Sequence, residues 1–349
     1  MKMIVRRFLA PLAFFISILL SAQALAFDVG GLSYTIIGAT NNVEVMGRQS
    51  GNTDLDIVIP DTVVDGTTNY SVTSVVKFAF FDNALTSVTI GNSVTSIGKE
   101  AFAFNALTSV IIPDSVISIM LGAFGNNAIT TLTIGNSVTS IGVDAFRANA
   151  LTSVSIPDSI TTIEGYAFYS NALTSVTIGN SVATIGERAF AENDLISVTI
   201  GDSVRIIGEE AFGRNEVLTS VTIGNSVTTI GVGAFQASDL TTVIIPDSVT
   251  SIGERAFGDN TLASVAFEGN FGTFSPDMFD QNPDLAKITY CEGKAGWPQA
   301  FDNGSTTITT TSIACAAVIS TPVPTSPLWL LGIMVGLLSL VAVRKLRKA

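Results

Sequence analysis

A motif of 22 residues recurs along most of this chain of 349 residues. The clearest marker of a copy is an Ala-Phe pair, and its spacing changes only once, to 23 residues, where Glu216 is inserted. A tenth, weaker copy carries Met278 and Phe279. A fixed period of this length predicts a solenoid, in which each copy forms one coil that contacts its neighbours. The regular phenylalanines are Phe80, Phe102, Phe124, Phe146, Phe168, Phe190, Phe212, Phe235 and Phe257.

The first half of a copy predicts a strand. Residues 87–90 alternate Ser, Val, Thr and Ile, which is the two-residue period of a strand with one buried face. Gly91, replaced by Pro113 in the next copy, then ends the strand.

The second half of a copy predicts turns. Val94 and Ile97 lie three residues apart and indicate a second buried edge made of turns. Gly98 predicts a bend with positive φ, and residues 100–102 predict a short helical turn with Phe102 at the centre of the coil. The residues expected to point inward are Leu85, Val88, Ile90, Val94, Ile97, Ala101 and Phe102.

The copy at 107–127 resembles the repeat of BspA-like bacterial leucine-rich repeat proteins. That pattern runs Leu-x-x-Val/Leu-x-Ile-Pro-x-x-Leu/Val-x-x-Ile-Gly-x-x-Ala-Phe-x-x-Cys/Asn, and the resemblance covers about 230 residues. It implies a curved leucine-rich-repeat solenoid with short parallel β-strands on one face, turns and short helical turns on the other, and here about ten coils of 22–23 residues. It also implies a secreted or surface-exposed protein, in a family that includes adhesins and has no single ligand. The matching residues are Leu107, Val110, Ile112, Pro113, Val116, Ile119, Ala123, Phe124 and Asn127.

Residues 1–26 predict a secretory signal peptide for signal peptidase. Lys2, Arg6 and Arg7 precede an apolar run over 8–20, and Ala24-Leu25-Ala26 provides a small-x-small cleavage site. An uncleaved anchor is the alternative.

Residues 322–349 combine a Pro-rich start, an apolar run over 328–343 and a basic end. As a helix the run would span about 24 Å, and its basic end should stay cytoplasmic. The layout is similar to PEP-CTERM-type sorting tails, and Val323-Pro324-Thr325 with Trp329 is closest to the IPTL variant. The resemblance implies processing by an exosortase-type membrane enzyme, and a plain membrane anchor is the alternative.

Between these ends we expect a β-hairpin cap over 27–56, the solenoid over 57–290, and a C-terminal cap followed by a Thr-rich linker over 291–321. Cys291 and Cys315 are the only cysteines. In an exported chain they should form a disulfide, which would stabilise the cap by about 3 kcal/mol.

Charge and composition exclude several classes of function. The net charge is −12, and without its two ends the chain carries 10 basic against 29 acidic residues, which argues against nucleic acid and anionic lipid surfaces as partners. The sequence has no His and no phosphate-binding or nucleophile-elbow motif. We therefore expect no catalysis and no cofactor.

Two polar columns recur at the turns. An Asn stands three residues after each Phe, except at Ser238, and is expected to satisfy backbone groups along the stack. Elsewhere Asp and Asn alternate from copy to copy, each followed by Ser, as in Asp114 and Asn136. Turn-forming Asx-Ser pairs explain this second column most simply, and a calcium ladder is the alternative.

Hydroxyl residues of the strands form the candidate binding surface. They should point outward in two columns and offer a neutral face to an extracellular protein or glycan. Such residues also suit any exposed strand, so a structural role in an extracellular matrix or biofilm stays open. An ice- or mineral-binding lattice is a remote alternative. The candidate residues are Ser87, Thr89, Ser109, Thr131, Thr133, Ser153, Ser155, Ser175, Thr177, Ser197, Thr199, Ser220 and Thr222.

Overall fold

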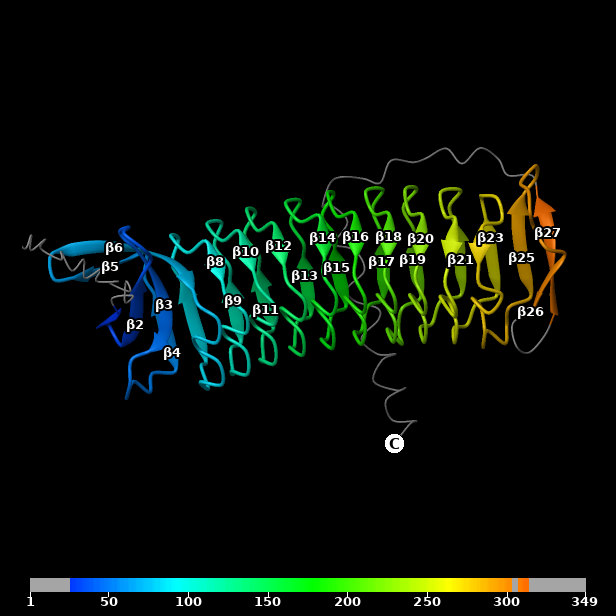
Figure 1. Cartoon of the computed structure of the whole chain (residues 1–349). Helices are drawn as coiled ribbons and strands as arrows, with labels where there is room; N and C mark the ends of the chain where they lie inside the picture. Colours follow the sequence, from blue (N-terminus) through cyan, green and yellow to red (C-terminus); the bar gives the residue numbers. More distant parts are fainter. Residues whose placement is uncertain (1–25, 303–306, 314–349) are drawn as a thin grey trace, which may run out of the picture. The chain divides into compact units, whose positions relative to one another are not determined.

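The computed structural model describes residues 26–302 and 307–313. The expected signal peptide, apart from Ala26, and the expected sorting tail lie outside these residues, as does Cys315. In the described part the chain winds into about 11 coils that stack in sequence order (Figure 1). No helix there is long and apolar enough to cross a membrane.

Each coil contributes one strand to a first strand row. In this row β9 pairs with β11 in parallel, with Ser109 opposite Thr131, so equivalent residues of successive copies lie side by side. The row consists of β4 (Asp56–Ile59), β7 (Ser87–Ile90), β9 (Ser109–Ile111), β11 (Thr131–Thr133), β13 (Ser153–Ser155), β15 (Ser175–Thr177), β17 (Ser197–Thr199), β19 (Ser220–Thr222), β21 (Thr242–Ile245), β23 (Ser264–Phe267), β25 (Lys287–Cys291) and β27 (Thr307–Ile313).

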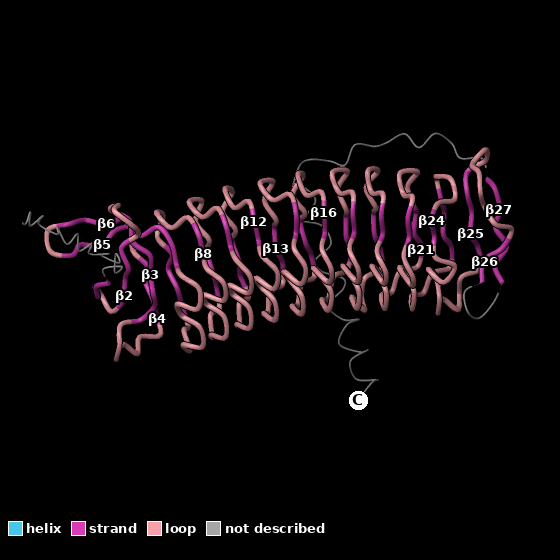
Figure 2. Tube along the Cα trace, viewed as in Figure 1, coloured by secondary structure: helices cyan, strands magenta, loops and turns pink. Residues whose placement is uncertain are grey.

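A second strand row lies where the sequence predicts only turns. Apart from β6, its strands have two residues each. They pair in parallel from coil to coil, for example Ile97 of β8 with Ile119 of β10, and the ladder is continuous. Figure 2 shows both rows along the stack. The second row consists of β6 (Thr68–Val75), β8 (Ser96–Ile97), β10 (Ser118–Ile119), β12 (Ser140–Ile141), β14 (Thr162–Ile163), β16 (Thr184–Ile185), β18 (Ile206–Ile207), β20 (Thr229–Ile230), β22 (Ser251–Ile252) and β24 (Thr273–Phe274).

The core lies between the two rows. Phe102 and Phe124 are fully buried, and their ring centroids are 5.1 Å apart with an interplanar angle of 9°. This parallel stack continues from Phe80 to Phe257. Because one coil leaves both sides of its ring uncovered, burial of each Phe depends on the neighbouring coils.

The predicted helical turn at 100–102 is wrong: the described residues contain no helix. Glu100 has φ 51°, which a right-handed helix cannot accommodate. The backbone N–H groups of Glu100, Phe102 and Phe104 donate to carbonyls of the next coil at 2.8–3.0 Å instead of to their own coil. Hydrogen bonding along the stack therefore replaces helical hydrogen bonding.

The positive φ predicted for Gly98 is also wrong, since Gly98 does not lie in the left-handed region. A Cβ added at Gly98 would lie 2.6 Å from the backbone nitrogen of Lys77 in the preceding coil. Glycine is required here because two backbones approach closely.

The N-terminal end is covered by a β-meander. β1 (Ala26–Val29), β2 (Leu32–Ile36) and β3 (Asn42–Arg48) pair antiparallel in order, and β3 then pairs in parallel with β6. β5 (Thr62–Asp65) pairs antiparallel with β6, so the residues that follow β4 form a hairpin. Tyr34 of β2 is buried.

The C-terminal end extends the solenoid beyond the sequence expectation. Residues 307–313, expected as linker, form β27, which pairs in parallel with β25 and antiparallel with β26 (Ala300–Asp302). Trp297 closes this end by stacking on Tyr290 with ring centroids 5.0 Å apart. Cys291 lies opposite Ile313 in the ladder, and Ile313 precedes Cys315 by two residues. The disulfide between Cys291 and Cys315 stays a prediction.

Candidate binding surface

The outward side chains of the first strand row form an exposed face, which we call the hydroxyl face. In β7, Ser87 and Thr89 are exposed, whereas Ile90 is buried. The same alternation exposes every candidate residue in two columns. The first column contains Ser87, Ser109, Thr131, Ser153, Ser175, Ser197 and Ser220, and the second contains Thr89, Thr133, Ser155, Thr177, Thr199 and Thr222.

A third hydroxyl column borders the first and was missed in the sequence analysis. Thr130 Oγ1 donates to the carbonyl of Thr108 at 3.1 Å, and Thr174 Oγ1 donates to that of Thr152 at 3.2 Å. The signal was present, since these residues repeat one position before the first column. The third column contains Thr86, Thr108, Thr130, Thr152, Thr174, Thr219 and Thr241, all exposed.

From β4 to β19 the hydroxyl face is built in units of two coils, and from β21 to β27 the ladder is continuous. β9 pairs with β11 and β13 with β15, but β11 and β13 form no ladder. Burial follows the same alternation: Val110 is buried and Leu132 half-buried. The surroundings of the exposed hydroxyl groups therefore differ between alternate coils along the face.

The Asp/Asn column follows the same two-coil period. Asp114 Oδ1 accepts a hydrogen bond from the backbone N–H of Asn136 at 2.7 Å, and Asp158 accepts one from Asn180 at 2.7 Å. Successive aspartates are two coils apart, about 10 Å, so they cannot share one cation. No group of three or more metal-ligating residues occurs in the described chain. This geometry favours the turn-forming reading of the column.

The hydroxyl face is polar but contains apolar side chains and one carboxylate. Ile111 is 68% exposed and Ile244 58% exposed. At the N-terminal end, Asp56 accepts hydrogen bonds from Ser87 Oγ at 2.8 Å and Thr86 Oγ1 at 2.9 Å, which hold the pKa of its carboxyl below the usual value. No Lys or Arg stands in the three hydroxyl columns, and the exposed Lys287 of β25 continues the register of the first column only at the C-terminal end of the row.

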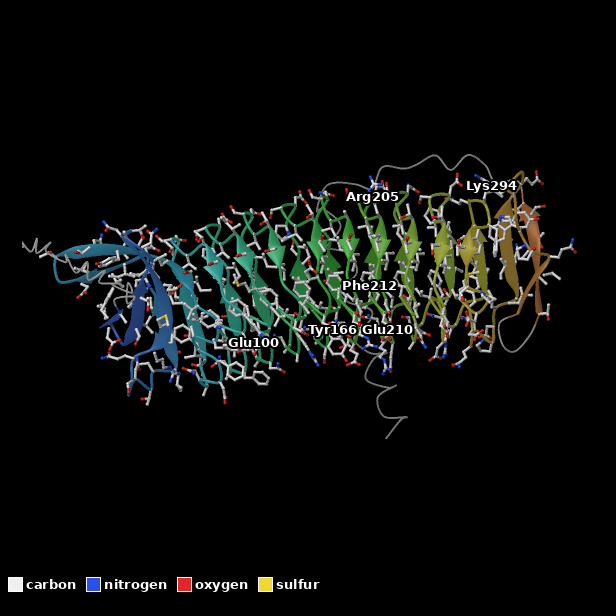
Figure 3. All side chains as sticks on the ribbon, in the orientation of Figure 1. Glu100, Tyr166, Arg205, Glu210, Phe212 and Lys294 are labelled. Atoms are coloured by element: carbon white, nitrogen blue, oxygen red, sulfur yellow. The ribbon has the colours of Figure 1, made fainter. Side chains whose placement is uncertain are left out.

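Charged side chains gather instead at the edge formed by the turns before and after each Phe, which we call the turn edge. Glu100, Tyr166 and Glu210 lie along it, opposite Arg205 (Figure 3). Arg188 donates to both carboxylate oxygens of Glu210, at 2.7 and 2.9 Å. This bidentate ion pair links two successive coils.

Tyr166 joins the same network. Its hydroxyl donates to Glu187 Oε1 at 2.6 Å and accepts from Arg188 Nη1 at 3.1 Å. The bond to Glu187 raises the pKa of Tyr166, because ionisation would break it.

Solved structures of other leucine-rich repeat proteins are similar to this chain. A leucine-rich repeat protein from Bacteroides ovatus has 26% identity and a TM-score of 0.68, covering 76% of this chain and 70% of that one. The pneumococcal vaccine antigen PcpA has 16% identity and a TM-score of 0.44, covering 76% of this chain and 87% of that one. A leucine-rich cell surface protein from Faecalibacterium prausnitzii has 24% identity and a TM-score of 0.40, covering 76% of this chain and 94% of that one.

No functionally curated protein matches the sequence. The BspA type leucine rich repeat region matches at residues 73–196 and 184–308, which together make up more than half of the chain. The coils, the buried Phe stack and this match agree, and the chain belongs to the BspA-type leucine-rich repeat family.

Proposed function

We propose that this protein is a non-enzymatic binding and adhesion module that holds an extracellular protein or glycan on its hydroxyl face. The observation that carries the proposal is the exposure of the same hydroxyl positions in consecutive coils. The seven coils that carry the first column give a face about 30 Å long. A surface of this length suits a partner that makes many contacts, each of them weak.

The chemistry of the hydroxyl face supports a polar, uncharged contact. Hydroxyl groups exchange hydrogen bonds with water for bonds with a partner at small net cost, directly or through bridging water. Since the columns carry no Lys or Arg, binding should depend weakly on salt.

The lattice-binding alternative fits this face less well. A crystal surface requires evenly spaced groups, whereas the first strand row is paired in two-coil units from β4 to β19 and includes exposed Ile111 and Ile244. A structural role in an extracellular matrix remains an alternative outcome of the test.

The proposal includes export to the cell surface. It rests on the signal peptide expected at 1–26 and on the sorting or anchor segment expected at 322–349, which signal peptidase and an exosortase-type enzyme would process.

The test is a screen of the purified full chain against arrays of extracellular proteins and glycans at two salt concentrations. The proposal predicts a reproducible ligand whose binding changes little with salt. Self-association without any ligand would favour the matrix role, and binding only at low salt would contradict a neutral contact.

A further inference from the structure

From the coil of Phe80 to that of Phe257, each coil places at least two residues of the turn edge in the left-handed backbone region. In the first two coils these include Phe78, with φ 62°, and Phe104, with φ 57°. Glycine, Asn and Asp adopt this conformation at least cost, and a bulky side chain there is a true outlier. The identity of these residues is therefore not explained by the backbone that carries them.

Burial does not explain the two phenylalanines either. Phe78 is 45% exposed and Phe104 49% exposed. Their rings contact each other through Phe81, with centroid distances of 5.8 Å to Phe78 and 5.2 Å to Phe104. The three rings form a partly exposed aromatic ledge, and Lys99 Nζ lies over the Phe78 ring at 5.7 Å from its centroid. Exposed aromatic rings of this kind are typical of recognition surfaces.

A cavity of about 200 Å³ lies beside this ledge, across the second to fourth coils. The cavity is open at Gly122 and Gly125 because these residues have no side chains to fill it. In the fifth coil the equivalent positions are occupied by Tyr166 and Tyr169. Phe104 and Leu121 form an apolar wall. This volume is below that of a site for a drug-sized ligand and matches one small ring.

The opposite wall of the cavity is polar but electrically balanced. It contains Glu100, Asn126, Asp144 and Arg147. Asp144 pairs with Arg147 at 3.4 Å, and Glu100 pairs with Lys99 at 3.5 Å. The paired charges disfavour a free anion or cation and leave oxygen and nitrogen atoms that can bind hydroxyl groups.

We propose that this cavity binds a single neutral sugar ring of a glycan. The apolar C–H face of the sugar stacks on Phe104, and its hydroxyl groups bond to Glu100, Asn126 and Asp144. The ledge of Phe81 and Phe78 then receives the next sugar of the chain. This site is separate from the hydroxyl face, and failure of one proposal would leave the other unaffected.

The repeat itself supplies matched variants for the test. Gly125→Tyr places in the cavity the side chain that the fifth coil carries at Tyr169, and Gly213→Tyr makes the same change away from the cavity. The two glycines are comparable, since an added Cβ would lie 3.3 Å from a carbonyl oxygen of Asp144 or Glu210 respectively, and neither has positive φ.

The full chain, in a detergent without a sugar headgroup, is titrated with glucose, galactose, mannose and N-acetylglucosamine, and binding is followed by saturation-transfer NMR. We expect at least one of these sugars to bind, Gly125→Tyr to weaken it at least tenfold, and Gly213→Tyr to leave it unchanged. Absence of binding by all four sugars, or equal affinity of both variants for the bound sugar, would overturn the proposal.

A second variant separates binding from folding. Phe104→Asn installs the residue type that Asn126 provides in the next coil, and Asn tolerates positive φ. We expect the melting temperature to stay equal or rise while sugar binding falls at least tenfold. Retained sugar binding would overturn the role of Phe104.

Discussion

The side-chain amide of Asn193 donates to the carbonyl oxygen of Phe168, 25 residues earlier, at 3.1 Å. The same amide nitrogen also donates to the carbonyl oxygen of Phe190 at 3.1 Å. The Oδ1 of Asn193 accepts a hydrogen bond from the backbone N–H of Leu173 at 3.0 Å. One buried side chain thus satisfies backbone groups of two successive coils. This confirms the structural role expected for the Asn column.

Replacing this side chain should destabilise the solenoid. Asn193→Ala leaves buried backbone groups without partners, which should lower the free energy of unfolding by about 1–3 kcal/mol. Urea unfolding followed by circular dichroism measures the change, with Thr199→Ala on the exposed face as the control. Equal midpoints for the two variants would show that the column contributes nothing.

Ser238 is the exception in the column and offers the reverse experiment. It is 8% exposed, and among the described residues its Oγ is buried without a hydrogen-bond partner. Ser238→Asn should raise the free energy of unfolding by about 1 kcal/mol by restoring bonds to the backbone. If the variant is less stable than wild type, the residue inserted at Glu216 has reshaped this turn too far for Asn to fit.

The N-terminal meander should lose stability at alkaline pH. Burial raises the pKa of Tyr34 to about 12, from 10.0. Because the folded-state pKa is the higher one, the contribution is complete below pH 10 and is lost as pH rises toward 12. Thermal unfolding between pH 9 and 12 should show a steeper decline for wild type than for Tyr34→Phe. Parallel curves would mean that Tyr34 ionises as freely in the folded state as in the unfolded one.

The predicted Cys291–Cys315 disulfide should hold the last coil in place. Cys291→Ser should increase hydrogen exchange in β25 and β27 and leave the central coils protected, because local opening at an end leaves inner coils stacked. Mass spectrometry of non-reduced peptides tests the bond itself. Finding both thiols free in the exported protein would refute the pairing.

The repeat period was enough to predict the coils, and the alternation over 87–90 was enough to predict which side chains face outward. The positive φ of Glu100 was not predictable, since Glu has no local preference for that conformation and adopts it to bond with the next coil. The second strand row was missed because a two-residue strand such as Ser96–Ile97 is too short to show alternation.

The candidate surfaces differ in how far the sequence could reveal them. The hydroxyl columns follow from the repeat, so periodicity predicts them. The cavity beside Phe104 depends on Gly122 and Gly125, which stand at variable positions of the repeat, and on distances between side chains of different coils. A single sequence shows which residues occupy variable positions but not which of them lie together.

The affinity of a face variant for a ligand found in the screen tests the central claim most directly. Ser153→Lys, Ser175→Lys and Thr177→Lys together place three charges on the hydroxyl face, and Thr139→Lys, Thr161→Lys and Ala183→Lys place three beside the second strand row of neighbouring coils. Both variants should fold, since these side chains are exposed or half-buried. Our account predicts at least a tenfold loss of affinity for the first variant and none for the second. Equal affinities would place the ligand elsewhere and contradict the account.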